Sequence, residues 1–214
     1  MHGAHWYHGR IYRRYIDPRL DRTRQLIAEM VQPDSCVLEV GSGTGALAMQ
    51  LASRCRSVVG LDASAKMIRV AERARRGHPH GGRVQFLHAD AARMDRMVRG
   101  HFDFAVASLF LHTLDEARRR SVLRQMQSLA DRLILADVDA AAQTGTERLA
   151  RGAVELAAGL QHFRHWALFL RQGGLRALVE HAHLDVERTE LDERFGTLVM
   201  RTRPSRSKEK GSPS

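Results

Sequence analysis

The sequence predicts an α/β fold with a doubly wound, mostly parallel sheet and an antiparallel strand at its C-terminal end. Three observations support this prediction. Short apolar runs alternate with helical stretches, a glycine-rich turn follows the first run, and two late runs have no helix between them. Strands that alternate with helices form βαβ units, whose right-handed crossovers place helices on both faces of a parallel sheet.

Five apolar runs have the length and composition of buried strands, at residues 36–40, 57–62, 84–87, 102–108 and 132–138. Helical patterns follow three of these runs, at residues 46–54, 64–75 and 115–129. A further helix is expected over residues 175–183. Two late strands, at about 184–191 and 196–201, should then form the antiparallel edge of the sheet.

The remaining segments predict additions to this single domain, which we assign to residues 33–203. Residues 1–32 form a helical lead-in, in which Leu26, Ile27, Met30 and Val31 share one face and Pro33 ends the helix. A helical insertion is predicted at 140–172. Its first helix is indicated by an apolar face of Leu149, Ala153, Leu156 and Leu160.

Composition limits the class of protein. Of the net charge of +10, the last fourteen residues hold +4 and the first thirty +3, so the domain itself is nearly balanced. We predict a disordered basic tail at 204–214 and treat the charge as weak evidence for a nucleic-acid partner. Cys36 and Cys55 are expected to be reduced. No apolar stretch resembles a signal peptide or a membrane span, so we expect a cytoplasmic protein without a transmembrane segment.

The most informative stretch is the turn after the first strand, where residues 37–45 read V-L-E-V-G-S-G-T-G. Glycines at a strand-to-helix turn permit tight backbone conformations and let a ligand approach the main chain. The helix that follows offers unpaired N–H groups to an anionic group. The glycines alone also fit the G-x-G-x-x-A pattern of dinucleotide sites, so the turn by itself leaves a nicotinamide cofactor open.

Three carboxylates lie at or near the ends of the first three strands. Glu39 lies inside an apolar run two residues before Gly41, where a buried carboxylate needs a partner such as a ligand ammonium group. Asp62 ends the second strand and suits a ribose hydroxyl pair, while Asp90 closes the third strand and suits an adenine amine. Because Glu39 would repel a pyrophosphate, this set argues against a dinucleotide.

Four motifs occur in order: V-L-E-V-G-S-G-T-G, V-V-G-L-D-A-S, V-Q-F-L-H-A-D-A and F-D-F-A-V-A-S. With this order and spacing, the chain resembles the class I S-adenosylmethionine-dependent methyltransferases, most closely the small-molecule branch that includes ubiquinone-biosynthesis-type enzymes. The motifs span residues 36–112, and the strand pattern extends the resemblance to about residue 203. The resemblance implies a Rossmann-like, seven-stranded fold, S-adenosylmethionine as cofactor and S-adenosylhomocysteine as product.

The resemblance also implies which residues contact the cofactor. The glycine turn would hold the methionine end, the second strand end the ribose, and the third strand end the adenine. The implied contacts come from Glu39, Gly41, Ser42, Gly43, Gly45, Asp62, Ala63, Met67, Asp90, Ala91, Ser108 and Leu109. Structural alternatives stay open, since either aspartate could cap a helix and Met67 could belong to the core.

For catalysis, methyl transfer needs an acceptor atom held in line, and a general base only if the acceptor arrives protonated. His112, four residues beyond Ser108, is the candidate base, with a structural role near a helix start as its alternative. The resemblance implies that the lead-in at 1–32 acts as a lid and that the insertion at 140–172 covers the acceptor site. His162 and His165 lie in this insertion. His2, His5 and His8 lack accompanying carboxylates or thiolates, so we expect no metal.

The leading functional hypothesis is a methyltransferase for a small-molecule O, N or C acceptor. A lipid or RNA methyltransferase drawn to a polyanion by the basic ends, and a non-catalytic S-adenosylmethionine-binding protein, are the alternatives. Residues 108–111 read S-L-F-L and so lack the Asn/Asp-Pro-Pro-aromatic signature of amino-methylating nucleic-acid enzymes. Nucleic acid and anionic lipid are therefore secondary partners, and a homodimer is left open.

Overall fold

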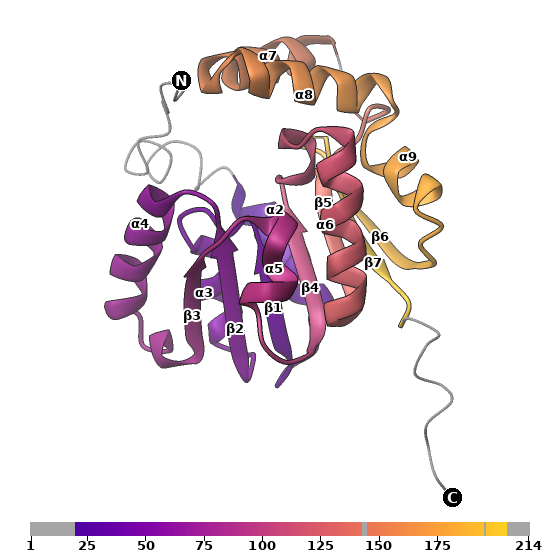
Figure 1. Cartoon of the computed structure of the whole chain (residues 1–214). Coiled ribbons are helices and arrows are strands. Elements are labelled where there is room, and N and C mark those ends of the chain that lie inside the picture. The colour runs from indigo at the N-terminus through magenta and orange to yellow at the C-terminus, as the bar shows by residue number, and fades with distance from the viewer. Residues whose placement is uncertain (1–19, 143–144, 195, 205–214) are drawn as a thin grey trace, which may run out of the picture.

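The core of the molecule is a seven-stranded sheet with the strand order β3-β2-β1-β4-β5-β7-β6 (Figure 1). The computed structural model describes residues 20–142, 145–194 and 196–204. Strands β1 to β5 are parallel, and β7 runs antiparallel to both β5 and β6. The predicted sheet with an antiparallel C-terminal strand is confirmed. The strands are β1 (Cys36–Val40), β2 (Ser57–Asp62), β3 (Val84–His88), β4 (Phe102–Ser108), β5 (Ala130–Val138), β6 (Val186–Asp192) and β7 (Thr197–Thr202).

Helices cover both faces of this sheet. Successive side chains of a strand point to opposite faces, so β4 contributes Phe104 and Val106 to one core cluster and Ala105 and Ala107 to the other. The first cluster includes residues of α2 (Asp21–Met30), α3 (Ala46–Ala52) and α4 (Ala65–Arg76). The second includes residues of α5 (Met94–Met97), α6 (Glu116–Leu129) and α9 (Gly174–His181). Single turns of 3-10 helix connect these elements at η3 (Gly81–Arg83), η4 (Ala91–Arg93) and η5 (Leu111–Thr113).

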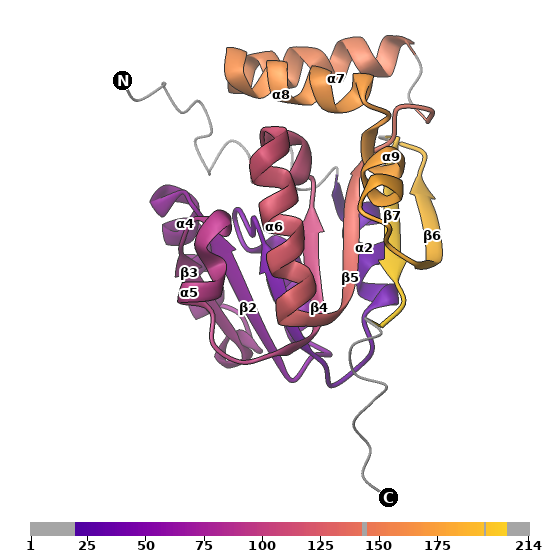
Figure 2. The ribbon, with the colours of Figure 1, turned by 45° about the vertical axis from the view of Figure 1, so that its right-hand side comes forward.

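Two further helices, α7 (Gly145–Ala158) and α8 (Leu160–Arg171), form a hairpin across the end of the sheet at which the parallel strands terminate (Figures 1 and 2). The α7–α8 hairpin comes directly after β5 and packs on η5, which follows β4. It therefore covers the strand ends that carry the predicted site residues. No helix among the described residues has the length and apolar character needed to cross a membrane.

Most predicted elements are confirmed with small shifts at their ends. The face of Leu26, Ile27, Met30 and Val31 is buried, as expected for the lead-in helix. Residues 1–19 of the lead-in and 205–214 of the predicted tail lie outside the described residues. The short helix α5 was not predicted.

The apolar face predicted for the first insertion helix does not lie against the core. The helix exists as α7, which ends at Ala158, so Leu160 begins α8 instead. Leu149, Leu156 and Leu160 are 77%, 50% and 66% exposed. Two other residues of α7 face inward instead. A side chain at Gly152 would come within 3.3 Å of the Trp166 ring, and Glu155 is buried near His112. The rotation of α7 is thus fixed by two contacts: the close packing of Gly152 against Trp166 and the contact of buried Glu155 with His112.

Candidate functional site

The turn after β1 has a backbone conformation that only glycine adopts without strain at three of its positions. Gly41, Gly43 and Gly45 have φ angles of 77°, 53° and 79°, in the left-handed region that favours glycine. A Cβ atom at Gly41 would lie 2.5 Å from the Phe110 ring, and one at Gly45 would lie 2.4 Å from the Phe86 ring. Gly43 has open space around its Cα, so only its φ requires glycine there. The turn thus has no side chain at three of its five positions.

Asp62, at the end of β2, binds this turn directly. Its Oδ2 accepts a hydrogen bond from the Gly43 N–H at 2.9 Å, and its Oδ1 accepts one from the Ser64 N–H at 2.7 Å. Burial raises the pKa of Asp62, and these two hydrogen bonds only partly oppose that effect. The cap of α4 is the Ser64 hydroxyl, which accepts from the Met67 N–H at 3.4 Å. Asp62 and the glycine turn are therefore brought together, as the motif order predicts.

The two other predicted polar contacts near the turn come from β1 and the turn itself. Glu39 is buried, with 3% of its surface exposed, and pairs in register with Gly60 of β2 and Val106 of β4. Ser42 is 6% exposed, and its hydroxyl makes no hydrogen bond to any of the described residues. A buried hydroxyl of this kind costs free energy unless it finds a partner. A glycine-rich turn flanked by buried polar groups fits a polar ligand such as S-adenosylmethionine.

The predicted adenine side is more open. Asp90 is exposed, and its Oδ1 accepts a hydrogen bond from the Ala92 N–H at 2.9 Å, so it caps η4 as the structural alternative foresaw. Ala91 is buried behind it. Ala63 is exposed next to Asp62, and the Met67 side chain is buried outside both core clusters. A helix cap and a ligand contact can coexist at Asp90, because a carboxylate has several acceptor positions.

The end of β4 carries a strained backbone. Ser108 is the last residue of the strand, and the next residue, Leu109, has a φ of 50°. For an ordinary side chain this left-handed conformation costs roughly 1–2 kcal/mol. It is held by a hydrogen bond of 2.7 Å from the Leu109 N–H to the Ala136 carbonyl of β5. Strain of this kind concentrates at functional sites, and here it directs the chain into η5 and His112.

His112 lies between two carboxylates, and all three side chains are buried. Its Nδ1 is 2.6 Å from Asp137 Oδ1, and its Nε2 is 3.5 Å from Glu155 Oε1. The Asp137 carboxylate also accepts hydrogen bonds from the backbone N–H groups of His112, at 3.1 Å, and Val138, at 2.8 Å. Three elements thus meet in this cluster, namely η5, the end of β5 and the inward side of α7.

The cluster keeps His112 charged. Burial by itself would lower the pKa of His112, but the Asp137 carboxylate and then Glu155 outweigh it and raise the pKa to about 9. Burial would likewise raise the pKa values of Asp137 and Glu155, yet the His112 charge lowers both, with a smaller contribution from Arg151. At neutral pH the cluster therefore holds an imidazolium between two carboxylates.

Sequence reasoning missed Asp137 and Glu155. Asp137 is a carboxylate inside the apolar run L-I-L-A-D-V, the same signal that drew attention to Glu39. Glu155 gave no such signal, because the apolar spacing of its helix indicated a different buried face. His165, which was noted, donates from its Nδ1 to the Thr113 carbonyl at 2.8 Å and so joins α8 to η5.

Arg119 of α6 supports the same segment from the other side. Its guanidinium donates to the carbonyls of Leu111 and Leu114, at 3.0 and 2.8 Å, on either side of His112. It also lies 4.5 Å from the centre of the Phe169 ring of α8, in cation–π geometry. Phe169 in turn lies beside His112, with ring centres 6.5 Å apart. Buried groups from β5, α6, α7 and α8 thus contact His112 or the residues beside it.

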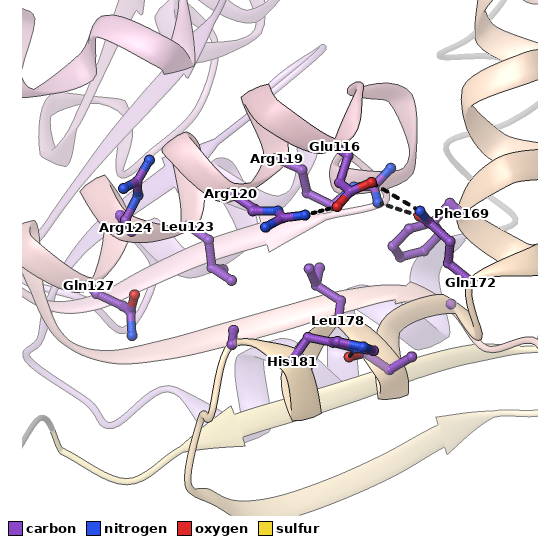
Figure 3. Close-up of a pocket in the computed structure, with 13 residues that line it drawn as sticks. Glu116, Arg119, Arg120, Leu123, Arg124, Gln127, Phe169, Gln172, Leu178 and His181 are labelled. Carbon is purple, nitrogen blue, oxygen red and sulfur yellow. Dashed lines mark hydrogen bonds and ion pairs between the residues drawn. The ribbon is translucent and has the colours of Figure 1, made fainter.

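A groove of about 730 Å³ opens between α6, the end of α8 and α9 (Figure 3). Arg119 and Phe169 form its inner end, and Glu116 and Arg120 pair with each other at its rim. None of its lining residues belongs to the glycine turn, β1 or β2. The groove is therefore separate from the predicted cofactor site. Within the described ranges, no cluster of His, Cys, Asp and Glu is arranged to hold a metal ion.

Comparison with known sequences identifies a domain and one partial relative. Residues 37–131 match the family model described as "Methyltransferase domain". The ribosomal RNA small subunit methyltransferase A of Geobacter metallireducens is 38% identical over 71 residues, which are 32% of this chain and 25% of that protein. The chain thus spans about a quarter of the curated relative that it matches.

Comparison with solved structures identifies the fold. Magnesium protoporphyrin IX methyltransferase from Synechocystis PCC 6803, with bound S-adenosylhomocysteine, has a TM-score of 0.62 at 21% identity, covering 87% of this chain and 82% of that one. The N-methyltransferase NodS from Bradyrhizobium japonicum WM9 has a TM-score of 0.60 at 17% identity, covering 87% and 96%. An O-methyltransferase family protein from Burkholderia thailandensis has a TM-score of 0.66 at 18% identity, covering 92% and 59%.

Proposed function

We propose that this chain is a class I S-adenosylmethionine-dependent methyltransferase, which transfers the methyl group of S-adenosylmethionine to a small-molecule acceptor. The match of residues 37–131 to a methyltransferase-domain model supports this proposal. The observation that carries the proposal is the turn with three glycines at positive φ, in which the Gly43 N–H is hydrogen-bonded to Asp62. A structural neighbour named as a magnesium protoporphyrin IX methyltransferase, whose named acceptor is a small molecule, supports a small acceptor. An acceptor of the ubiquinone-precursor type, and a cytoplasmic location, belong to this proposal.

In this proposal different groups of the predicted residues contact different parts of the cofactor. Glu39 and the turn from Gly41 to Gly45, with the Ser42 hydroxyl, would hold the methionine end. Asp62 and Ala63 would hold the ribose, and Met67, Asp90 and Ala91 would lie beside the adenine. When bound, S-adenosylmethionine supplies a methyl group that its sulfonium already activates. Ser108 and Leu109 would line the cofactor where β4 ends.

His112 is our proposed base for an acceptor that arrives protonated. Asp137 occupies its Nδ1, so Nε2, which faces Glu155 beneath the α7–α8 hairpin, is the nitrogen that would take the proton. With a pKa of about 9, the neutral base form grows as pH rises through the alkaline range. We therefore expect kcat/KM for such an acceptor to increase with pH, with a midpoint near pH 9, and to level off at higher pH.

The first test is cofactor binding by calorimetry, with S-adenosylmethionine, S-adenosylhomocysteine and NAD offered separately to the wild type and to Asp62→Ala. We expect the first two to bind and NAD not to bind. Loss of one or two hydrogen bonds to a charged group predicts roughly ten- to a hundredfold weaker binding by Asp62→Ala. The matched control is Asp131→Ala, which lies beside His101 at the N-terminal end of β5, at the edge of the sheet away from the predicted site. This variant should bind the cofactor as the wild type does. Binding of NAD alone would overturn the proposal.

A ribosomal RNA acceptor is the second candidate, because one exposed face of α4 is basic. Arg69, Arg73 and Arg76 stand three or four residues apart on this helix, and none has a carboxylate partner among the described residues. The helix begins beside Asp62, and the partial relative is named a ribosomal RNA methyltransferase. Binding of a ribosomal RNA fragment that falls steeply with salt, and weakens in Arg69→Glu/Arg73→Glu, would favour this candidate.

A further inference from the structure

The outer surface of the α7–α8 hairpin is unusually apolar. Seven large hydrophobic side chains are strongly exposed among the described residues, and five of them lie on these two helices. The five are Leu149 (77% exposed), Val154 (43%), Leu156 (50%), Leu160 (66%) and Leu168 (44%). Single exposed leucines are ordinary on a protein surface, but a concentration on one hairpin marks an interaction surface.

These side chains lie on the solvent-exposed sides of the two helices. On α8, Trp166 and Phe169 are buried, while Leu160, Arg164, Leu168 and Arg171 recur at helical spacing on the opposite side. On α7, Leu149 and Leu156 stand seven residues apart and share one face. Both views of the fold place the hairpin at the end of the molecule, with no other labelled element beyond it (Figures 1 and 2). On α8, leucines and arginines therefore share one exposed face, and Leu149 and Leu156 add an exposed apolar face on α7 of the same hairpin.

The charge of this surface is positive. Residues 145–171 contain four arginines and two glutamates, and one of the glutamates, Glu155, is buried against His112. Arg164 and Arg171 are exposed and have no carboxylate partner within the described ranges. An amphipathic helix with leucines and arginines on its free side suits the boundary of an anionic bilayer, where leucines enter the acyl region and guanidinium groups meet lipid phosphates.

We propose that the outer surface of the α7–α8 hairpin, formed by Leu149, Leu156, Leu160, Arg164, Leu168 and Arg171, docks this protein on an anionic lipid surface. A second copy of the chain fits less well, because a symmetric interface would bring Arg164 and Arg171 against like charges. A nucleic-acid backbone would use the arginines but leave the leucines in water. The lipid surface satisfies both kinds of side chain.

This surface has a consequence for the acceptor, which rests on the methyltransferase function proposed above. The hairpin covers the ends of β4 and β5 through the contacts of Glu155 with His112 and of His165 with Thr113. Docking through its outer side would hold the site directly beneath the lipid headgroups. The acceptor class that follows is an amphiphile dissolved in the membrane.

The test is flotation of the full chain with two kinds of vesicle, one of phosphatidylcholine and one of equimolar phosphatidylcholine and phosphatidylglycerol. We expect the protein to float with the anionic vesicles only. Leu160→Ser/Leu168→Ser and Arg164→Glu/Arg171→Glu should each reduce the partition coefficient roughly tenfold or more. Both pairs are exposed, so the fold should persist, as circular dichroism would check.

Matched controls separate this surface from the basic ends of the chain. Leu191→Ser alters an exposed leucine of β6, and Arg69→Glu/Arg73→Glu makes the same charge change on α4. Both should float like the wild type. Equal loss in the α4 variant would mean that net charge alone governs binding, and it would overturn the proposal. So would a dimer in sedimentation velocity that Leu160→Ser/Leu168→Ser abolishes, which would assign the surface to a second copy.

Calorimetry with S-adenosylmethionine keeps the two proposals apart. The hairpin variants should bind the cofactor as the wild type does, because the substituted side chains are exposed and α8 provides none of the proposed cofactor contacts. Lipid binding without cofactor binding would remove the proposed enzyme function and leave the docking surface intact. Cofactor binding without flotation of the wild type would do the reverse.

Discussion

His112 carries its charge out of contact with water, held by side chains from β5 and α7. A buried ion pair gains from mutual attraction but loses hydration, so removing one partner is much more costly than the pair itself is stabilising. Here the Asp137 carboxylate also accepts two backbone N–H groups, which fixes its position independently of the ring. Glu155 contacts the imidazole less closely than Asp137 does, since its carboxylate lies 3.5 Å from Nε2. It is therefore the partner through which the pKa of His112 can be tested.

At the residue scale, we predict that Glu155→Gln lowers the pKa of His112 from about 9, because one of the two neighbouring negative charges is removed. The measurement is an NMR titration of the His112 imidazole in the wild type and the variant. Glu190→Gln, on the distant strand β6, should leave the titration unchanged. A wild-type pKa near the ordinary value of 6.5 would contradict the geometry of the cluster.

Helix α8 divides its two faces between different tasks. Its inward face, with Trp166 and Phe169, joins the core cluster on the α6 and α9 side of the sheet. Phe169 also stacks against the Arg119 guanidinium, whose hydrogen bonds hold the segment on either side of His112. Its outward face carries Leu168, which contributes little to folding because much of its surface remains in water.

At the element scale, we therefore predict different costs for two adjacent substitutions on α8. Phe169→Ala removes a buried ring and should lower the free energy of unfolding by roughly 3–5 kcal/mol. Leu168→Ala, at 44% exposure, should change it by about 0.5 kcal/mol or less. Urea unfolding followed by circular dichroism measures both. Similar losses for the two variants would mean that the hairpin packs in another orientation.

The whole molecule consists of two hydrophobic clusters on either side of the sheet and a hairpin joined to it partly through charged groups. Between pH 6 and 9 the clusters contribute little pH dependence, whereas the charged contact contributes strongly. Because the pKa of His112 is raised in the folded state, its contribution to stability is complete below about pH 6.5 and is lost as pH rises through about 9. Asp137 and Glu155, whose pKa values are lowered, lose their contribution as pH falls into the acid range.

At the whole-molecule scale, we predict that the free energy of unfolding is highest near pH 6 and declines toward pH 9. The raised pKa of His112 accounts for a decline of up to roughly 3 kcal/mol. Burial raises the pKa of Cys55 from 9.0 to about 11, so this thiol lowers the free energy of unfolding only as pH rises above about 9. It therefore does not mask the decline between pH 6 and 9. Urea titrations at successive pH values measure the decline, and His112→Asn should flatten it. An equal slope in that variant would assign the pH dependence to other groups.

The sequence by itself determined the strands, most of the helices and the glycine turn with Asp62. These features depend on local properties of the chain. A short stretch of sequence is enough to show a hydrophobic period of two or 3.6 residues, or a glycine where the backbone needs a positive φ. The order of the motifs added the class of fold. Even Asp137 left a local trace, as a carboxylate in an apolar strand.

Only the tertiary structure decided which groups surround His112 and which face of α7 is buried. Asp137 lies 25 residues beyond His112, and Glu155 comes from a separate helix, so no local pattern joins the three. The apolar spacing on α7 predicted the helix but not its rotation, because a helix at the end of a sheet can bury any side that finds partners. Glu155 found its partner in His112 and Gly152 in Trp166, which turned Leu149 and Leu156 toward solvent.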